Sequence, residues 1–212
     1  MEFTAEQVWG AAVAADRING GYIKEDVWVF EGGCKKRLNQ ANKAMVKSWL
    51  RDNDFVEVTA QDYQAGVECR NHFKSYLMRT LAGTINEFET QAMRLAAKDT
   101  FTSRDLFDFA VISCLPNSAR MDQKNQAIKR EIWESTSIGG EVGSTIIGDI
   151  TVLNNRWNSQ YGKYRITARM NDSVVDFRND KAFTEGETVH IKARIKCHRD
   201  NNTTQLNYVK RA

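Results

Sequence analysis

Proline, histidine and paired cysteines are scarce in this 212-residue chain, which has one proline (Pro116) and three histidines. Its four cysteines lie far apart, without a Cys-x-x-Cys pair and without histidines at metal-ligand spacing. This pattern argues against a zinc site, so we expect no metal and no cofactor. We expect instead reduced, mostly buried thiols, as in proteins of the cytoplasm.

Long hydrophobic runs are also missing. No segment approaches the roughly 18 apolar residues that a membrane-crossing helix needs. The first residues, MEFTAEQVWG, lack the basic start of a secretory signal. With 42% hydrophobic and 27% charged residues, the composition is typical of a globular protein long enough for two modest domains. We expect no membrane partner.

Residues 1–134 are predicted to form a helical domain. Thr4 and Thr59 each precede an acidic or amide side chain by three residues, as in a helix capping box, and Thr102 with Asp105 repeats the pattern. A first helix is expected to end near Ile18, before a glycine pair. Further helices are expected over residues 35–52, 60–98 (with breaks at Gly66 or Gly83), 106–115 and 118–134. Residues 22–33 fit a hairpin or an irregular loop.

Residues 135–145, STSIGGEVGST, are small, polar and rich in glycine, so they are interpreted as a linker. Beyond them the hydrophobic period changes to two. In TVHIKARIKCH (188–198), for example, apolar and polar residues alternate along the whole segment, which predicts a strand. The predicted strands span residues 146–153, 163–170, 173–178, 188–198 and 204–209.

These five strands predict the fold class: α+β in two domains, with a small five-stranded β-barrel over residues 146–212. Their count and spacing match the oligonucleotide/oligosaccharide-binding (OB) type, and a small SH3-like barrel is the main alternative. Residues 145–212 contain 12 Lys and Arg against 7 Asp and Glu, whereas the rest of the chain is slightly acidic. The basic balance favours a polyanionic partner for this part.

The candidate binding residues combine cations on the second and fourth predicted strands with a cation and two aromatics in the loop NNRWNSQYG. They are Arg156, Trp157, Tyr161, Lys163, Arg165, Arg169, Lys192, Arg194 and Lys196. Aromatic rings can stack on the bases of a single strand of nucleic acid, while cations neutralise its phosphates. The alternative is that Trp157 closes one end of the barrel and the cations form a solvated face.

Short motifs resemble C-terminal OB-like segments in proteins of tailed bacteriophages. They are Gly148-Asp149-Ile150, Tyr161-Gly162, Gly186 to Ile191, and Tyr208 to Arg211. The helical part, with GYIKED from Gly21 and TAQDYQAG from Thr59, resembles uncharacterised marine phage proteins. The resemblance implies a phage product of replication or recombination, located in the cytoplasm of the infected bacterial host.

Enzymatic patterns are weak. The segment 139–145 lacks the Gly-Lys-[Ser/Thr] of a phosphate-binding loop, and the Cys69–His72 pair has no orienting third group. We therefore expect no catalytic residues. The predicted function is a non-enzymatic accessory protein that binds single-stranded nucleic acid, DNA being favoured over RNA, with a helical domain that binds a replication protein. The alternative is a protein–protein adaptor that docks on a phage or host replication or transcription protein.

Overall fold

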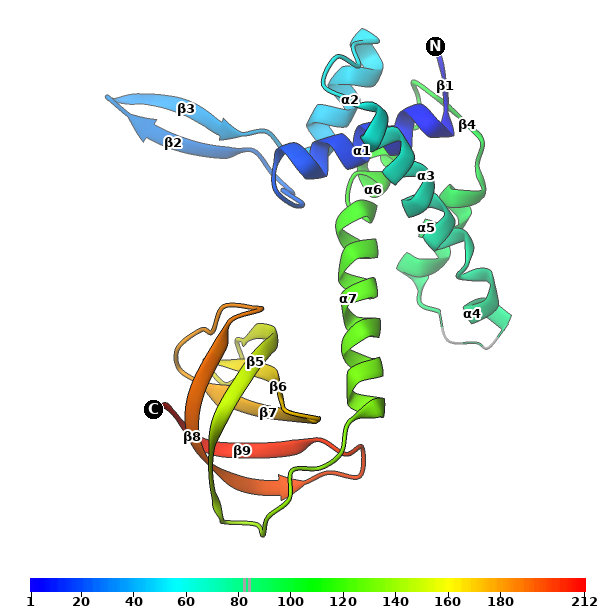
Figure 1. Ribbon diagram of the computed structural model, residues 1–212. Helices are drawn as coiled ribbons and strands as arrows, with labels where there is room; N and C mark the ends of the chain where they lie inside the picture. The colour runs from blue at the N-terminus through cyan, green and yellow to red at the C-terminus, as the bar shows by residue number, and fades with distance from the viewer. Residues whose placement is uncertain (82, 84) are drawn as a thin grey trace. The chain divides into compact units, whose positions relative to one another are not determined.

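The computed structural model describes residues 1–81, 83 and 85–212 (Figure 1). The chain divides into two compact units, Met1–Gln123 and Lys124–Ala212. The first is built mainly of helices, and the second contains a closed five-stranded β-barrel. The predicted fold class, helical part followed by a small barrel, is therefore confirmed.

The helices and short strands before the barrel are α1 (Ala5–Ile18), α2 (Asn42–Asp52), α3 (Ala60–Lys74), α4 (Leu77–Leu81), α5 (Glu87–Ala97), α6 (Leu106–Ile112), α7 (Leu115–Glu134), β1 (Glu2–Thr4), β2 (Val27–Glu31), β3 (Cys34–Asn39) and β4 (Thr100–Thr102). Strand β1 pairs with β4, and β2 pairs with β3, both antiparallel.

Two of the predicted capping boxes are confirmed. The side chain of Thr4 accepts a hydrogen bond from the Gln7 backbone, and that of Thr59 accepts one from Asp62. The third prediction is corrected, because Thr102 ends β4 and the helix begins only at Leu106. The Asp105 carboxylate accepts a hydrogen bond from the Thr102 backbone at 2.6 Å, so the pattern closes a turn instead of opening a helix.

The expected helix over residues 35–52 begins only at α2, because residues 34–39 form the second strand of a hairpin. The turn is Gly32-Gly33, and both residues have positive φ. Such a pair favours the two-residue turns that match the twist of hairpins. Pro116 falls between the predicted helices that end at 115 and begin at 118, but it lies in the first turn of α7, where its missing N–H costs no helical hydrogen bond.

Helices α1 and α3 cross with their backbones in close contact. A Cβ atom on Gly66 would lie 2.8 Å from the backbone nitrogen of Gly10, and one on Gly10 would lie 2.5 Å from the Tyr63 ring. Gly66 therefore does not break the helix, as the sequence suggested it could, but permits the crossing. The core around this crossing includes fully buried Trp9 and Phe73.

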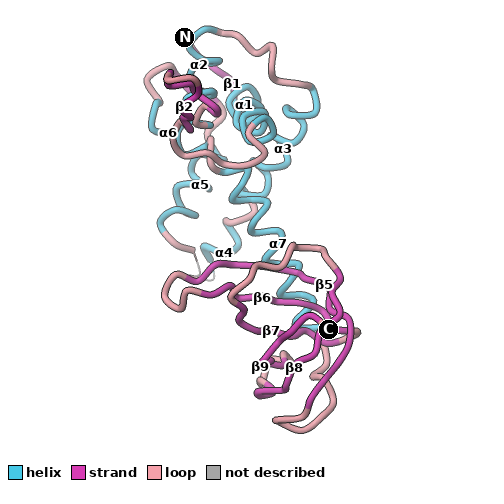
Figure 2. Tube along the Cα trace, turned by 90° about the vertical axis from the view of Figure 1, so that its left-hand side faces the viewer, coloured by secondary structure: helices cyan, strands magenta, loops and turns pink. Residues whose placement is uncertain are grey.

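The barrel strands are β5 (Thr145–Asn158), β6 (Lys163–Met170), β7 (Ser173–Asn179), β8 (Thr188–His198) and β9 (Thr204–Arg211). Their order around the barrel is β5-β6-β7-β9-β8, with β5 and β8 closing it (Figure 2). All pairs are antiparallel except β7 with β9. Each predicted strand is present, and the arrangement is compatible with an OB-like barrel.

Strand alternation fills the barrel core as predicted. On β8, Ile191, Ala193 and Ile195 are buried, while the lysines and the arginine between them are exposed. Strand β5 contains a register shift between Val152 and Asn154. An extra residue in one strand reverses which side chains face inward beyond it. The polar stretch after this bulge continues as strand to Asn158. Because the bulge interrupts the alternation of apolar and polar residues, the sequence pattern did not reveal this part of the strand.

The glycine-rich segment 135–145 lies against the barrel. The backbone N–H of Thr136 donates to the carbonyl of Asp172 at 3.1 Å, and that of Gly143 donates to Ile195 at 2.8 Å. Ile138 packs on the barrel core. The division between the two compact units falls within α7, after Gln123, so the end of this helix and the glycine-rich segment belong to the second unit.

Candidate nucleic-acid interface

Three arginines lie side by side on the outer face of the barrel. Antiparallel pairing places Arg156 of β5 opposite Arg165 of β6, and Arg165 opposite Arg178 of β7. All three side chains are exposed, and side chains opposite each other across a ladder share one face of the sheet. We call these residues the arginine row.

Neighbouring groups hold two members of the arginine row in place. The guanidinium carbon of Arg178 lies 4.0 Å from the centroid of the Tyr161 ring, which comes from the β5–β6 loop. Arg165 lies 4.0 Å from the buried carboxylate of Asp176, which also accepts a 2.9 Å hydrogen bond from Arg199. The second carboxylate oxygen of Asp176, Oδ1, is buried without a hydrogen-bond partner. Asp176 therefore faces two arginines, Arg165 of the row and Arg199 outside it. A single shared acid does not neutralise the three arginines of the row, which keeps a net positive charge.

Arg156 and Trp157 were predicted in a loop, and this is corrected because both lie on β5. Trp157 pairs in register with Tyr164, and the two ring centroids are 4.9 Å apart in an edge-to-face arrangement. Successive side chains of a strand point to opposite faces, so Trp157 is turned away from the arginine row. The residue is 52% exposed, so Trp157 both packs on Tyr164 and contacts solvent.

Two further candidates on β6 have acidic neighbours. Lys163 lies 3.2 Å from Asp180, an exposed pair that screens its charge only weakly. Arg169 lies further along β6, and its guanidinium is 4.0 Å from the carboxylate of Glu131 at the end of α7. The structure therefore brings Lys163 to the arginine row but not Arg169, which lies beside Glu131.

The strand order separates the predicted residues into two groups, because β6 and β8 are not neighbours in the barrel. Lys192, Arg194 and Lys196 are exposed on β8. The ion pairs of the described barrel involve other cations, and these three take part in none of them. The second group is thus an unneutralised set of cations on its own strand.

A hollow of about 530 Å³ connects the groups at the point where β7 and β9 separate. The parallel pairing of these strands covers Val175 with Thr204 and Asp176 with Gln205, and beyond it they diverge. We call this the β7–β9 hollow. The residues that line it include Tyr161, Lys163 and Lys196 from the predicted set, and Arg178 and Tyr208, which the sequence analysis missed.

The sequence contained part of the information needed to find Arg178 and Tyr208. Arg178 ends the segment SVVDFR, which was predicted as a strand, but its position beside Arg165 depends on the register of two strands. Tyr208 belongs to the tail that resembles phage proteins, where no role was assigned to it. A bulge that exposes this tyrosine cannot be seen in the sequence.

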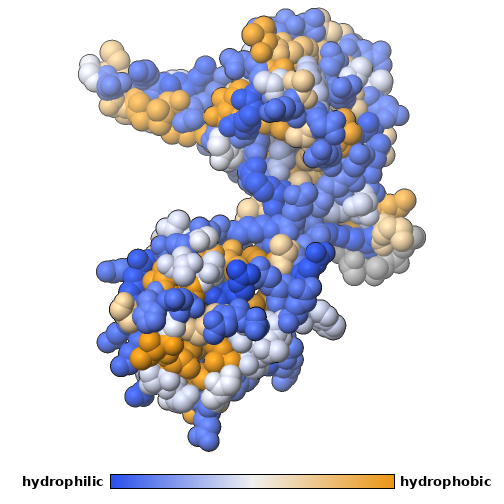
Figure 3. Space-filling view, in the orientation of Figure 1, coloured by the Kyte–Doolittle hydropathy of each residue, from blue (hydrophilic) through white to orange (hydrophobic). Residues whose placement is uncertain are grey.

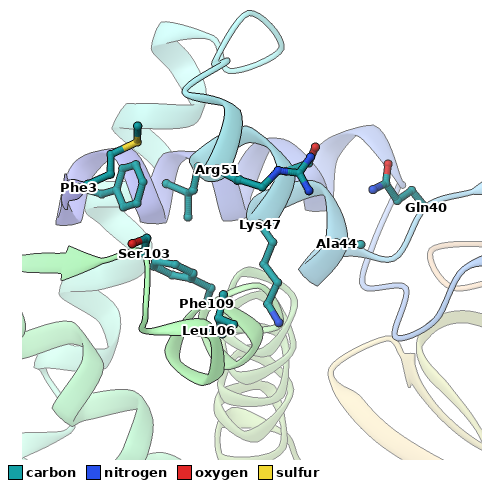
Figure 4. Close-up of a pocket in the computed structure, with 11 residues that line it drawn as sticks. Phe3, Gln40, Ala44, Lys47, Arg51, Ser103, Leu106 and Phe109 are labelled. Atoms are coloured by element: carbon teal, nitrogen blue, oxygen red, sulfur yellow. The ribbon is translucent and has the colours of Figure 1, made fainter.

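The helical unit presents two apolar surfaces of its own. The β2–β3 hairpin projects from the helices of this unit, and hydrophobic residues gather along its β2 strand (Figure 3). Phe30 is 79% exposed, and Trp28 on the same face is half-exposed with Lys35 4.7 Å from its ring centroid. A pocket of about 610 Å³ lies between β1, α2 and α6 (Figure 4). It is lined by apolar side chains such as Phe109 together with Lys47.

A polar cluster joins α3 to α7 in the helical unit. His72 Nε2 lies 3.1 Å from the Tyr76 hydroxyl, which donates to Asp122 at 3.0 Å, and Arg79 donates to the same carboxylate at 2.9 Å. Burial lowers the pKa of His72 and raises that of Tyr76. Burial also raises the pKa of the Cys69 thiol to about 12, so Cys69 is not an activated nucleophile.

No protein-family model, no curated protein and no solved structure matches this chain. Among the described residues, no helix combines the length and apolar character needed to cross a membrane. In the same part of the chain, no group of three His, Cys, Asp or Glu side chains is arranged to hold a metal ion.

Proposed function

We propose that the barrel binds single-stranded nucleic acid and that the protein is a non-enzymatic accessory factor. The observation that carries the proposal is the arginine row. Like charges directly opposite each other across a ladder are destabilising, and here two such pairs occur side by side, Arg156 with Arg165 and Arg165 with Arg178. Local rules are broken in this way mainly at functional sites. A run of phosphates would remove the repulsion.

The chemistry around the row favours a single strand. Tyr161 and Tyr208 are exposed beside the cations, and unpaired bases have free faces that can stack on such rings. In OB-like barrels the outer face of the second and third strands, with adjoining loops, binds oligonucleotides. Arg165 and Arg178 lie on that face. The motifs that resemble phage proteins extend the proposal to a role in phage replication or recombination, with DNA as the favoured ligand.

The test is fluorescence-anisotropy titration of a labelled thymidine oligonucleotide at low salt. Non-specific binding typically begins at a Kd of about 10⁻⁴ to 10⁻⁶ M, so wild-type protein should bind below about 100 μM. Changing both Arg156 and Arg178 to Ala should weaken binding. It should also reduce the slope of log K against log salt by about 0.7 for each lost phosphate contact.

Arg169→Ala is the matched control, because Arg169 is an exposed arginine of the same sheet that faces Glu131 away from the row. It should bind nearly as wild type does. The proposal fails if wild-type protein shows no binding at 100 μM, a limit of about 10⁻⁴ M for non-specific contacts. It also fails if Arg169→Ala weakens binding as much as the double variant does.

A second candidate, a protein-binding adaptor, is favoured by the exposed hairpin. An isolated two-stranded hairpin is marginally stable in water, and an exposed aromatic such as Phe30 is enriched at protein interfaces. The pocket beside Lys47 would accept an apolar side chain accompanied by an acidic one. In this reading the helical unit docks on a replication or transcription protein.

The adaptor function is tested by capture from lysate after nuclease treatment. Wild-type protein should retain its partners, whereas a Trp28→Ser, Phe30→Ser variant should lose them. Partners lost by nuclease alone would show that nucleic acid bridges them, and would contradict this candidate while leaving the first intact.

A further inference from the structure

Tyr208 has an unusual backbone conformation for a strand residue. Its φ is +53°, in the left-handed region that non-glycine residues adopt at a cost. It lies where β9 bulges against β8: Lys192 pairs with Lys210 and Arg194 pairs with Asn207, so Tyr208 has no partner of its own in the ladder. The residue is 77% exposed. An exposed aromatic side chain thus stands on a strained backbone.

Tyr208 also separates two hollows. It lines the β7–β9 hollow and a second one of about 500 Å³ over β8 and β9, which we call the β8–β9 hollow. The β8–β9 hollow is lined by Lys192, Arg194 and Lys210. An exposed ring thus stands between two cationic depressions on one surface of the barrel.

Like charges also lie opposite each other in the β8–β9 hollow, as they do in the arginine row. Lys192 and Lys210 are opposite each other across the β8–β9 ladder, another like-charge pair. Neither takes part in the ion pairs of the described barrel, whose cations are on other positions. The like-charge pair is unfavourable electrostatically, and the positive φ of Tyr208 is unfavourable conformationally. These two independent costs occur at residues that line the same hollow.

We propose that Tyr208 inserts between two consecutive bases of a bound single strand, so that one base occupies each hollow. Phosphate on one side would contact Lys192 and Lys210, and the strand would continue on the other side past Arg178 to the arginine row. This proposal rests on the proposed function and adds the path of the strand, from β8 across β9 to β7. It also assigns a stacking role to Tyr208.

The test compares a thymidine oligonucleotide with an abasic strand of equal length, each titrated at low salt. Base–aromatic stacking contributes roughly 1–3 kcal/mol per base, so Tyr208→Ala should weaken thymidine binding by at least about 5- to 150-fold, the loss expected from one of the two stacked bases. Binding of the abasic strand should change less than about twofold, because it has no base to stack. Tyr208→Phe keeps the ring and should bind as wild type does.

A Lys192→Ala, Lys210→Ala variant provides the opposite signature. It should lower the affinity for the thymidine strand and for the abasic strand to the same extent. It should also lower the salt dependence of binding, because it removes phosphate contacts. Equal losses on both strands for Tyr208→Ala would instead indicate a structural role and overturn the proposal, as would an unchanged affinity for thymidine. If wild-type protein binds neither strand, the proposed function itself fails, which is a separate result. The same titrations with uridine and abasic RNA show whether the site prefers DNA.

A stability measurement isolates the backbone strain. Glycine adopts positive φ freely, so Tyr208→Gly should be more stable to urea than Tyr208→Ala while binding thymidine equally weakly. If Tyr208→Gly were the less stable of the two, the backbone at Tyr208 would not be strained and the ring would not be held at a conformational cost.

Discussion

Asp62 shows how one residue can connect a helix start to the rest of the helical unit. Its side chain is nearly fully buried, and its carboxylate accepts hydrogen bonds from the Thr59 backbone at 2.8 Å and from two Arg17 nitrogens at 2.9 Å. Burial alone would raise the pKa of this carboxyl, but the hydrogen bonds from Arg17 and Thr59 outweigh burial and lower it. The ionised form is therefore stabilised in the folded state.

Asp62→Asn should lower the free energy of unfolding of the helical unit by roughly 2–4 kcal/mol at pH 7, because an amide carries no charge and replaces one acceptor oxygen with an N–H donor that faces Arg17 or Thr59. A depressed folded pKa stabilises the protein above the unfolded pKa of about 3.9 and loses that effect as pH falls through the folded value. The difference between variant and wild type, measured by urea unfolding, should thus shrink below about pH 3.9.

Glu68→Gln, on the exposed face of the same helix, is the control and should change stability by less than about 0.5 kcal/mol. An Asp62→Asn effect that stayed constant down to acid pH would mean that the charge of this carboxylate does not contribute.

At the scale of elements, the crossing of α1 and α3 depends on the absence of one side chain. Gly66→Ala would place a methyl group 2.8 Å from the Gly10 nitrogen and 2.9 Å from the Trp9 carbonyl carbon, both backbone atoms that cannot rotate away. Alanine is favoured over glycine in helices by about 1 kcal/mol. We nevertheless expect Gly66→Ala to destabilise the protein by about 1–3 kcal/mol in urea unfolding, because overpacking outweighs propensity.

Gly139→Ala is the comparison, because a Cβ at that position would have open space around it. It should be nearly neutral. A Gly66→Ala variant as stable as wild type would show that the two helices can separate without loss.

At the scale of the whole molecule, each unit has its own hydrophobic core. One core surrounds Trp9 and Phe73, and the other, around Phe177 and Ile191, fills the barrel. We expect two thermal transitions in calorimetry. Phe177→Ala should lower the barrel transition, since removing a buried phenylalanine costs roughly 3–5 kcal/mol, and Asp62→Asn should lower the other. One transition that moved with either variant would indicate that α7 couples the units.

The periodic features of this protein were predictable from the sequence, because they depend on local geometry. Alternation along residues 188–198 places Ile191 inside and Lys192 outside in any sheet, since side chains of a strand alternate. The capping boxes at Thr4 and Thr59 also involve residues three positions apart. The prediction failed at Arg156 and Trp157, where the bulge in β5 interrupts the alternation that identifies a strand.

What the tertiary structure alone decided is the arrangement of charge across strands. The row of Arg156, Arg165 and Arg178 requires two registers and a strand order that result from closing the barrel, and barrel closure joins residues distant in the chain. The exposure of Tyr208 depends on a bulge between β8 and β9, and its left-handed φ has no signature in residue type. Sequence determined the alternation along each strand, whereas the bulges and the closure of the barrel determined which outward side chains meet.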